Sequence, residues 1–395
     1  APMGGLAWLQ PPPPAHGPIL CGRRCGAVPG RLGRGPTPRP YLPSHPAASP
    51  PTGAGRVAAF KGGEWEGELP CVGVFDSGIG GLSVVAAMQE LQPNVPVSYV
   101  ADNGFFPYGD RSQESIRQRV LEVGSQLVGE GCCMLVVACN TACSAALEEL
   151  RASVGVPVVG VEPPLKPAVL GSTSKRVIVL ATRSTAGGAR LARLTEAWGS
   201  GARVWALPMP GLADLVEAGE VTGGRVEEML LQSMDEALAE GADAVALGCT
   251  HYTFLEETLQ RLLPGHVRIV GSAMPIARRA LQIHAQVCVE RGLITAEDVE
   301  VMYGGSLRSL DELRGAAGLG LMDVGAGGAW LGLGSGSRDD VEVAEVIISA
   351  TGDHIALRRA VERLVAQGQM LPRRAVYRGG TPPLVPGARR EHPPR

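Results

Sequence analysis

The chain has 395 residues and a formal net charge of −3, which is enough length for two domains and a sizeable core. The nearly balanced charge gives no electrostatic reason to expect nucleic acid or a membrane surface as a partner. No apolar run reaches the roughly 18 residues that a membrane-spanning helix needs. The nine cysteines are an odd number and indicate reduced thiols rather than a disulfide framework.

The N-terminal stretch differs in composition from the rest of the chain. Residues 1–63 contain no Asp or Glu but six Arg and fourteen Pro, so we expect residues 1–69 to be disordered. A basic, acid-free N-terminus is also typical of an organellar transit segment, although serine is scarce and proline interrupts any amphipathic helix. This predicts an organelle, with a plastid favoured if the source is a photosynthetic eukaryote. The alternatives are a tail that carries no address and a cytoplasmic protein.

Between residues 70 and 325, short β-rich runs alternate with helical stretches. The expected helices include 112–129, 225–240 and 274–291. The expected strands are 72–75, 97–101, 135–138, 156–161, 177–181, 204–207, 244–247 and 267–270. Such alternation predicts an α/β protein with parallel sheets flanked by helices. In these sheets ligands bind outside the carboxyl ends of the strands.

The C-terminal part changes character again. Residues 326–338 are Gly-rich and predict a flexible linker. Within a C-terminal extension at 339–371, residues 341–349 fit a strand and residues 354–366 fit an amphipathic helix. Residues 372–395 are rich in Pro and Arg and predict a disordered tail.

Two segments of the core resemble each other. Cys139 and Cys249 each follow an apolar run and precede a helical pattern, which places a thiol where helix N–H groups favour thiolate. Two such thiols in two similar halves point to a site attacked from both faces, as when a proton leaves one side of a carbon and returns to the other. His251 is a candidate acid–base partner of Cys249. Zinc is disfavoured because these residues form no CxxC-type cluster.

Two further motifs follow expected strands. Asp76 and Ser77 begin the Gly-rich segment 76–81, whose glycines permit close backbone approach to an anionic group. The segment lacks the final glycine of a dinucleotide fingerprint and the ending of a P-loop. Pro107, Tyr108 and Gly109 precede a helix start at Ser112. Each motif alone is also compatible with an ordinary turn.

Together these motifs resemble the aspartate/glutamate racemase family, and within it the glutamate racemases. The likeness rests on the order and spacing of 75–82, 107–109, 138–142 and 248–252, and it covers about residues 71–325. It implies two similar domains, 70–161 plus 272–325 and 162–271, with the active site in the cleft between them. It also implies interconversion of L- and D-glutamate without a cofactor, with D-glutamate serving peptidoglycan precursor synthesis.

The resemblance also assigns roles. Cys139 and Cys249 become the two acid–base residues, facing the α-hydrogen of the D- and L-isomer respectively, and Asp76 and His251 assist them. The implied substrate contacts are Ser77, Pro107, Tyr108, Gly109, Asn140, Thr141, Thr250, Glu217, Thr182 and Thr185. The chain departs from the family pattern at Cys143, Thr253, Gly271 and Asn103-Gly104.

Other interpretations stay open. A racemase acting on aspartate or on a broader set of amino acids shares the two-cysteine plan. A Cys–His amidase explains one cysteine and leaves the other unexplained. A non-catalytic amino-acid-binding protein of the same fold keeps the site without turnover. The sequence does not decide between a monomer and a homodimer.

Overall fold

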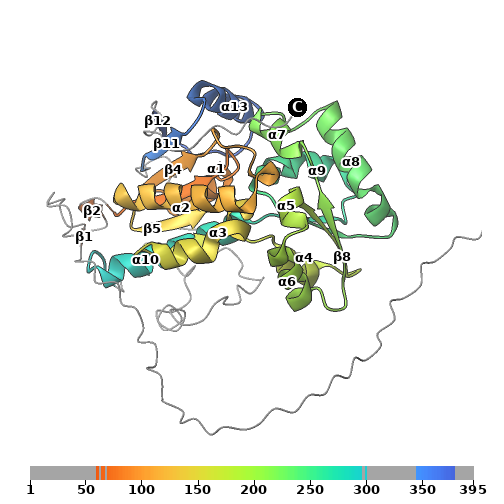
Figure 1. The fold of residues 1–395 in the computed structure, drawn as a ribbon, viewed down its shortest axis with the longest axis horizontal. Helices are drawn as coiled ribbons and strands as arrows, with labels where there is room; N and C mark the ends of the chain where they lie inside the picture. The colour runs from red at the N-terminus through yellow and green to blue at the C-terminus, as the bar shows by residue number, and fades with distance from the viewer. Residues whose placement is uncertain (1–58, 62–63, 67–68, 296–298, 300–343, 379–395) are drawn as a thin grey trace, which may run out of the picture. The chain divides into compact units, whose positions relative to one another are not determined.

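The computed structural model describes residues 59–61, 64–66, 69–295, 299 and 344–378. In this part of the chain, two parallel sheets carry helices on both faces, as the alternating sequence pattern predicts (Figure 1). The expected linker at 326–338 and most of the expected N-terminal transit segment lie outside the described residues. A short antiparallel pair, β1 (Ala59–Lys61) and β2 (Glu64–Glu66), falls within the stretch predicted to be disordered.

The first sheet has six parallel strands in the order β12-β11-β4-β3-β5-β6. Their bounds are β3 (Val72–Asp76), β4 (Val97–Ala101), β5 (Met134–Val137), β6 (Val158–Gly160), β11 (Val346–Ala350) and β12 (Ala375–Arg378). The strands β3, β4 and β5 at its centre are fully buried, which explains why their sequences are mostly apolar rather than alternating between apolar and polar residues.

The second sheet has four parallel strands in the order β10-β9-β7-β8. They are β7 (Arg176–Ala181), β8 (Arg203–Pro208), β9 (Ala244–Leu247) and β10 (Arg268–Val270). Both sheets lie in the same compact unit of the chain. All eight strands expected between residues 70 and 325 are present, with bounds that differ from the expected ones by at most two residues.

Helices cover both faces of each sheet, and side chains alternate between them. On the first sheet, Phe75, Leu135 and Val137 face α2 (Gln113–Gly129) and α3 (Asn140–Ser153). The opposite face packs against α1 (Leu82–Leu91), α10 (Ala273–Glu290) and α13 (His354–Ala366). The remaining helices are α4 (Leu165–Gly171), α5 (Arg183–Ala186), α6 (Ala189–Trp198), α7 (Leu212–Glu217), α8 (Gly224–Ala239) and α9 (Glu256–Leu262).

The C-terminal residues are part of the first sheet rather than an appendage. The predicted strand is present as β11, which pairs with β4 over Val346–Ala350, and the predicted helix 354–366 is α13. The prediction of a disordered tail from residue 372 is wrong for the first part of that stretch. Residues 375–378 form β12, which pairs with β11 on the edge away from β4. A four-residue strand is stabilised by its pairing with β11, and local composition does not report that pairing.

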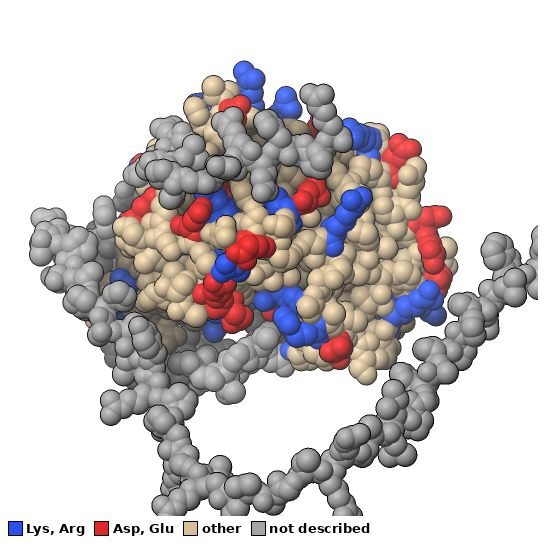
Figure 2. Space-filling model, viewed as in Figure 1, with Lys and Arg blue, Asp and Glu red and all other residues tan. Residues whose placement is uncertain are grey.

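Two further observations concern partners. None of the described helices combines the length and apolarity that crossing a membrane requires. On the face drawn in Figure 2, basic and acidic side chains lie next to one another rather than gathering into a patch of one sign.

Candidate active site

A cavity of about 130 Å³ opens at the carboxyl ends of strands from both sheets. It is smaller than the roughly 300–1,000 Å³ of pockets that take drug-sized ligands, so its volume suits a small metabolite. Ten of the residues singled out in the sequence line it: Cys139, Cys249, His251, Ser77, Pro107, Tyr108, Gly109, Asn140, Thr141 and Thr182. The two cysteines of the similar segments thus open onto one cavity.

Cys139 follows β5 and forms the N-cap of α3. Its sulfur accepts a hydrogen bond from the Ala142 N–H at 3.5 Å and lies 3.6 Å from the Ser77 hydroxyl, to which the thiol donates. Burial, followed by the nearby carboxylate of Asp76, raises the pKa of Cys139 well above its ordinary value, although the hydrogen bond from the Ala142 N–H opposes the shift. The free enzyme therefore holds Cys139 as a thiol at neutral pH.

Cys249 follows β9 and has a different environment. Its sulfur lies 3.9 Å from Nδ1 of His251, and Nε2 of His251 lies 2.8 Å from Oε2 of Glu217. The same carboxylate oxygen accepts the Ile79 N–H at 2.9 Å, so Glu217 is fixed by a residue of the first sheet's loop. Cys249 therefore contacts His251, and His251 in turn contacts the carboxylate of Glu217.

The charge of His251 follows from these contacts. Burial alone would lower its pKa, but the hydrogen bonds to Cys249 and Glu217 and the nearby charges of Cys249 and Asp76 raise the pKa well above its ordinary value. His251 is therefore a cation at neutral pH. Cys139 is buried beside the carboxylate of Asp76 and Cys249 faces the His251 cation, so the two sulfurs have opposite electrostatic surroundings.

Asp76 lies behind the cavity at the end of β3 and is completely buried. Its Oδ2 accepts the Gly81 N–H at 2.8 Å and the Thr250 hydroxyl at 3.4 Å. Burial raises the pKa of Asp76, and the charge of His251 acts in the opposite direction. Asp76 therefore influences Cys139 and His251 electrostatically without lining the cavity.

Asn140 has the clearest signature of a ligand contact. It lines the cavity and is 4% exposed, yet neither its side-chain oxygen nor its nitrogen has a partner among the described residues. A buried amide without partners is costly. A bound ligand with both a carboxylate and an amino group would satisfy both atoms, because the amide nitrogen donates to the carboxylate and the amide oxygen accepts from the amino group.

Three of the expected substrate contacts do not line the cavity. Thr185 contacts Thr182 and Thr141, Thr250 contacts Asp76, and Glu217 contacts His251. Thr185 and Glu217 therefore contact residues that line the cavity, and Thr250 contacts Asp76, which acts on cavity residues from behind. Within the described residues, no group of three or more His, Cys, Asp or Glu side chains is placed to hold a metal ion.

The sequence analysis missed part of the lining: Phe106, Asp110, Arg183, Met209, Pro210, Gly211, Ala213 and Asp214. Phe106 packs against the ring of His251 at a centroid distance of 5.6 Å. Residues 209–211 directly follow β8, and the rule that ligands bind at the carboxyl ends of parallel strands would have located them.

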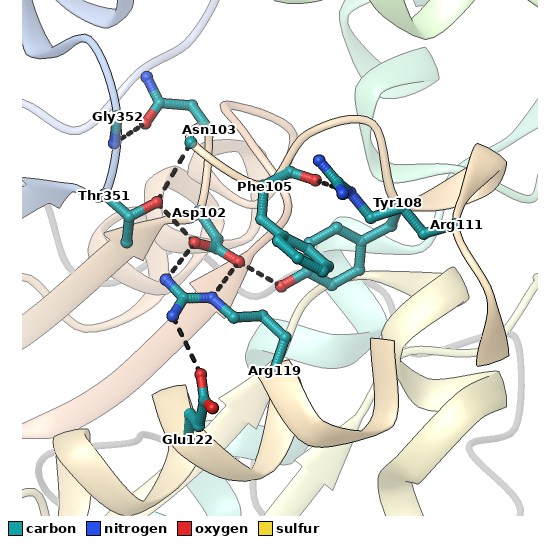
Figure 3. Close-up of polar contacts among 10 residues, drawn as sticks. Asp102, Asn103, Phe105, Tyr108, Arg111, Arg119, Glu122, Thr351 and Gly352 are labelled. Atoms are coloured by element: carbon teal, nitrogen blue, oxygen red, sulfur yellow. Dashed lines mark hydrogen bonds and ion pairs between the residues drawn. The ribbon is translucent and has the colours of Figure 1, made fainter. Parts of the chain in front are cut away.

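A buried carboxylate that the sequence did not single out holds one wall of the cavity. Asp102, at the end of β4, accepts hydrogen bonds from the Tyr108 hydroxyl at 2.6 Å and from Arg119 at 2.6 and 2.8 Å (Figure 3). The Thr351 hydroxyl donates to the same carboxylate at 2.5 Å. Tyr108, which lines the cavity, is thus held in place through its hydroxyl group, which Asp102 binds.

Replacing Glu217 with glutamine should change the pH dependence of turnover. The imidazolium of His251 is present below its pKa and is lost as the pH rises through that value. Because Glu217 helps to raise this pKa, Glu217→Gln should move the alkaline limb of the kcat profile to lower pH. Glu220 is exposed and lies just after α7, the helix that ends at Glu217, so Glu220→Gln provides the control. It should leave the alkaline limb of the kcat profile in place. An unshifted limb in Glu217→Gln would contradict the assigned charge of His251.

Gly78 has room for a side chain only if Glu217 moves. A methyl group there would collide with the carboxylate of Glu217. Gly78→Ala should therefore displace Glu217 and lower kcat about tenfold or more, which is the cost of weakening one charge-assisted hydrogen bond. Gly129→Ala, at a position with open space, should leave kcat unchanged. Equal kcat in both variants would show that the position of Glu217 does not matter.

Comparison with known proteins gives a consistent result. Residues 80–280 match the family model described as Asp/Glu/Hydantoin racemase. A glutamate racemase from Ectopseudomonas mendocina is 43% identical over 216 residues, which cover 54% of this chain and 82% of that protein. A glutamate racemase from Pseudomonas aeruginosa strain PAO1 is 41% identical over 213 residues, covering 54% of this chain and 80% of the relative.

Solved structures agree with the fold. The crystal structure of Escherichia coli glutamate racemase with L-glutamate and the activator UDP-MurNAc-Ala has a TM-score of 0.52 and 34% identity, covering 55% of this chain and 83% of that one. A glutamate racemase from Thermus thermophilus, in complex with β-chloro-D-alanine, has a TM-score of 0.53 and 26% identity, covering 78% and 96%. With two thiols on one cavity and a family model that spans half its length, the chain belongs to the Asp/Glu/hydantoin racemase family.

Proposed function

We propose that this protein interconverts L- and D-glutamate without a cofactor, with Cys139 and Cys249 as the two acid–base groups. The observation that carries the proposal is that both thiols line one small cavity, in a chain that is 43% identical over 216 residues to a glutamate racemase. The product D-glutamate would supply peptidoglycan precursor synthesis. A Cys–His amidase would need only the Cys249–His251 pair and would leave the placement of Cys139 without a use.

The proposed reaction moves one proton off the α-carbon and another onto its opposite face. With L-glutamate, the thiolate of Cys249 removes the α-hydrogen and the thiol of Cys139 donates its own. Turnover leaves Cys249 as thiol and Cys139 as thiolate, which is the form that acts on D-glutamate. A free thiol has a pKa of about 8.5, so both forms are accessible near neutral pH with modest electrostatic help.

The intermediate carries negative charge that spreads from the α-carbon into the carboxylate. Stabilising that charge requires hydrogen-bond donors aimed at the carboxylate oxygens. The side-chain amide of Asn140 is unpartnered and lies at the first turn of α3, where backbone N–H groups also favour an anion. Asn140 and this helix end are our candidates for the carboxylate-binding group.

The substrate assignment is tested with purified protein and two amino acids. L-glutamate and L-aspartate are incubated separately, and D-isomer formation is followed by chiral chromatography. We expect kcat/KM for glutamate to exceed that for aspartate clearly. Equal or faster turnover of aspartate would assign the protein to aspartate or broader racemases, and saturable glutamate binding without D-isomer formation would indicate a binding protein.

A further inference from the structure

The C-terminal segment, defined here as residues 344–378, contacts two parts of the chain that lie next to residues lining the cavity: the loop after β4 and the end of α7. Its strand β11 lies against β4, and its helix α13 buries Leu357, Val361 and Leu364 in the shared core. None of its residues lines the cavity itself. Any effect of this segment on catalysis must therefore pass through other residues.

The first contact is made where β11 ends. Thr351 donates its hydroxyl to Asp102 at 2.5 Å and accepts the Gly104 N–H at 3.2 Å, while the Gly352 N–H donates to Asn103 at 2.8 Å (Figure 3). These bonds fix the loop that leaves β4 and leads into the Pro107–Gly109 wall. The Thr351 hydroxyl and the Tyr108 hydroxyl bind the same buried carboxylate, so the segment is one hydrogen-bonded residue away from a cavity wall.

The second contact is made by α13 on the end of α7. Arg363 donates to the carbonyl of Ala218 at 2.8 Å, and Gln367 donates to the carbonyl of Gly219 at 2.8 Å. Carbonyls at the end of a helix lack intrahelical partners, and a cation there interacts favourably with the helix dipole. Because α7 has only six residues and ends at Glu217, these bonds fix the backbone beside the carboxylate that holds His251.

We propose that the C-terminal segment positions two parts of the active site, with Thr351 acting through Asp102 on Tyr108, and Arg363 with Gln367 acting through α7 on Glu217 and His251. Thr351, Arg363 and Gln367 are positioning residues that touch neither the substrate nor the reacting atoms. The kinetic arm of the test rests on the proposed glutamate racemase activity. The chemical arm does not.

The chemical arm measures thiol alkylation by iodoacetamide, with Cys249 and Cys139 quantified separately by peptide mass spectrometry. In the double variant Arg363→Ala/Gln367→Ala, the backbone beside Glu217 loses two hydrogen bonds, so Glu217 holds His251 less firmly and His251 becomes a weaker partner for Cys249. We expect the ratio of Cys249 to Cys139 alkylation at pH 7 to fall by roughly 2- to 10-fold, the scale of one lost hydrogen bond. Arg359→Ala, an exposed arginine on the same helix, is the matched control and should keep the wild-type ratio.

The kinetic arm compares Thr351→Val with Thr351→Ser. Valine keeps the shape and removes the hydroxyl, so the Tyr108 wall should bind substrate less well in both the ground and the transition state. This predicts a KM for L-glutamate raised about 3- to 10-fold with kcat within about twofold, whereas serine should retain the wild-type KM. A purely structural role would lower the fraction of active protein and hence kcat, without raising KM.

The outcomes separate the two proposals. An unchanged alkylation ratio in the double variant, a ratio that falls equally in Arg359→Ala, or a KM for Thr351→Val equal to that for Thr351→Ser would each overturn the positioning role. If wild-type protein forms no D-glutamate while the alkylation ratio still falls in the double variant, the proposed activity is wrong and the positioning of Glu217 stands.

Discussion

Replacing either Cys139 or Cys249 with serine is expected to lower the racemisation rate by roughly 10²–10⁴-fold, the range that a positioned acid–base group contributes. A serine hydroxyl is a far weaker acid than a thiol, so each variant lacks one of the two proton carriers. A glutamate analogue with a leaving group on the β-carbon needs only deprotonation, because elimination follows without proton return. Each variant should therefore still eliminate one enantiomer through its remaining cysteine.

The direction of that selectivity follows from the family resemblance. Cys249→Ser should process the D-analogue through Cys139, and Cys139→Ser should process the L-analogue through Cys249. Cys143→Ser is the matched control, because that thiol is buried and donates to the Val137 carbonyl rather than lining the cavity. Near-wild-type racemisation in either catalytic variant, or the same preferred enantiomer in both, would contradict a two-base mechanism.

Removal of the Arg119 side chain is the substitution with the largest expected effect on stability. Asp102 is fully buried, and Arg119 supplies its only cationic partner among the contacts that the described residues make with it. Breaking a buried ion pair costs about 3–5 kcal/mol, because the remaining charge is uncompensated. The Arg119 side chain is 24% exposed, so we expect Arg119→Ala to lower the free energy of unfolding by about 3 kcal/mol, at the low end of that range.

A neighbouring arginine provides the comparison. Arg117, on the same helix, pairs with Glu114 and Glu149 in solvent-exposed positions. Such exposed pairs contribute little to stability, so Arg117→Ala should lower the urea midpoint much less than Arg119→Ala. Urea denaturation of the two variants measures the difference. Equal midpoints would mean that the Asp102 carboxylate does not depend on Arg119.

The sequence was sufficient for elements whose signal is local. The strands at 72–76 and 244–247 are mostly apolar runs because helices cover both sheet faces, and helix 113–129 is marked by its Ser112 cap. Strand β12 was missed because it depends on pairing with β11. The Gly-rich stretch before residues 344–378 led the sequence analysis to treat these residues as an extension of the racemase core. In the structure their strand β11 pairs directly with β4.

The same distinction applies to the site. Cys139, Cys249 and Asn140 follow strands in recognisable motifs, so the sequence located them at the cavity. Asp102 carries no motif, and its role depends on Arg119 and Thr351 at sequence separations of 17 and 249 residues. The sequence also did not distinguish Glu217, which holds His251, from residues that line the cavity. Contacts behind the cavity depend on tertiary packing and leave no local pattern.

The position of the isotope label after one turnover tests the two-base claim most directly. L-glutamate with ordinary hydrogen at the α-carbon is incubated with wild-type protein in deuterated water, and both isomers are recovered at low conversion for mass analysis. Two cysteines on opposite faces predict D-glutamate that carries deuterium at the α-carbon, while the remaining L-glutamate carries almost none. D-glutamate that retains the substrate hydrogen would instead mean that one group removes and returns the same proton, and would contradict the mechanism.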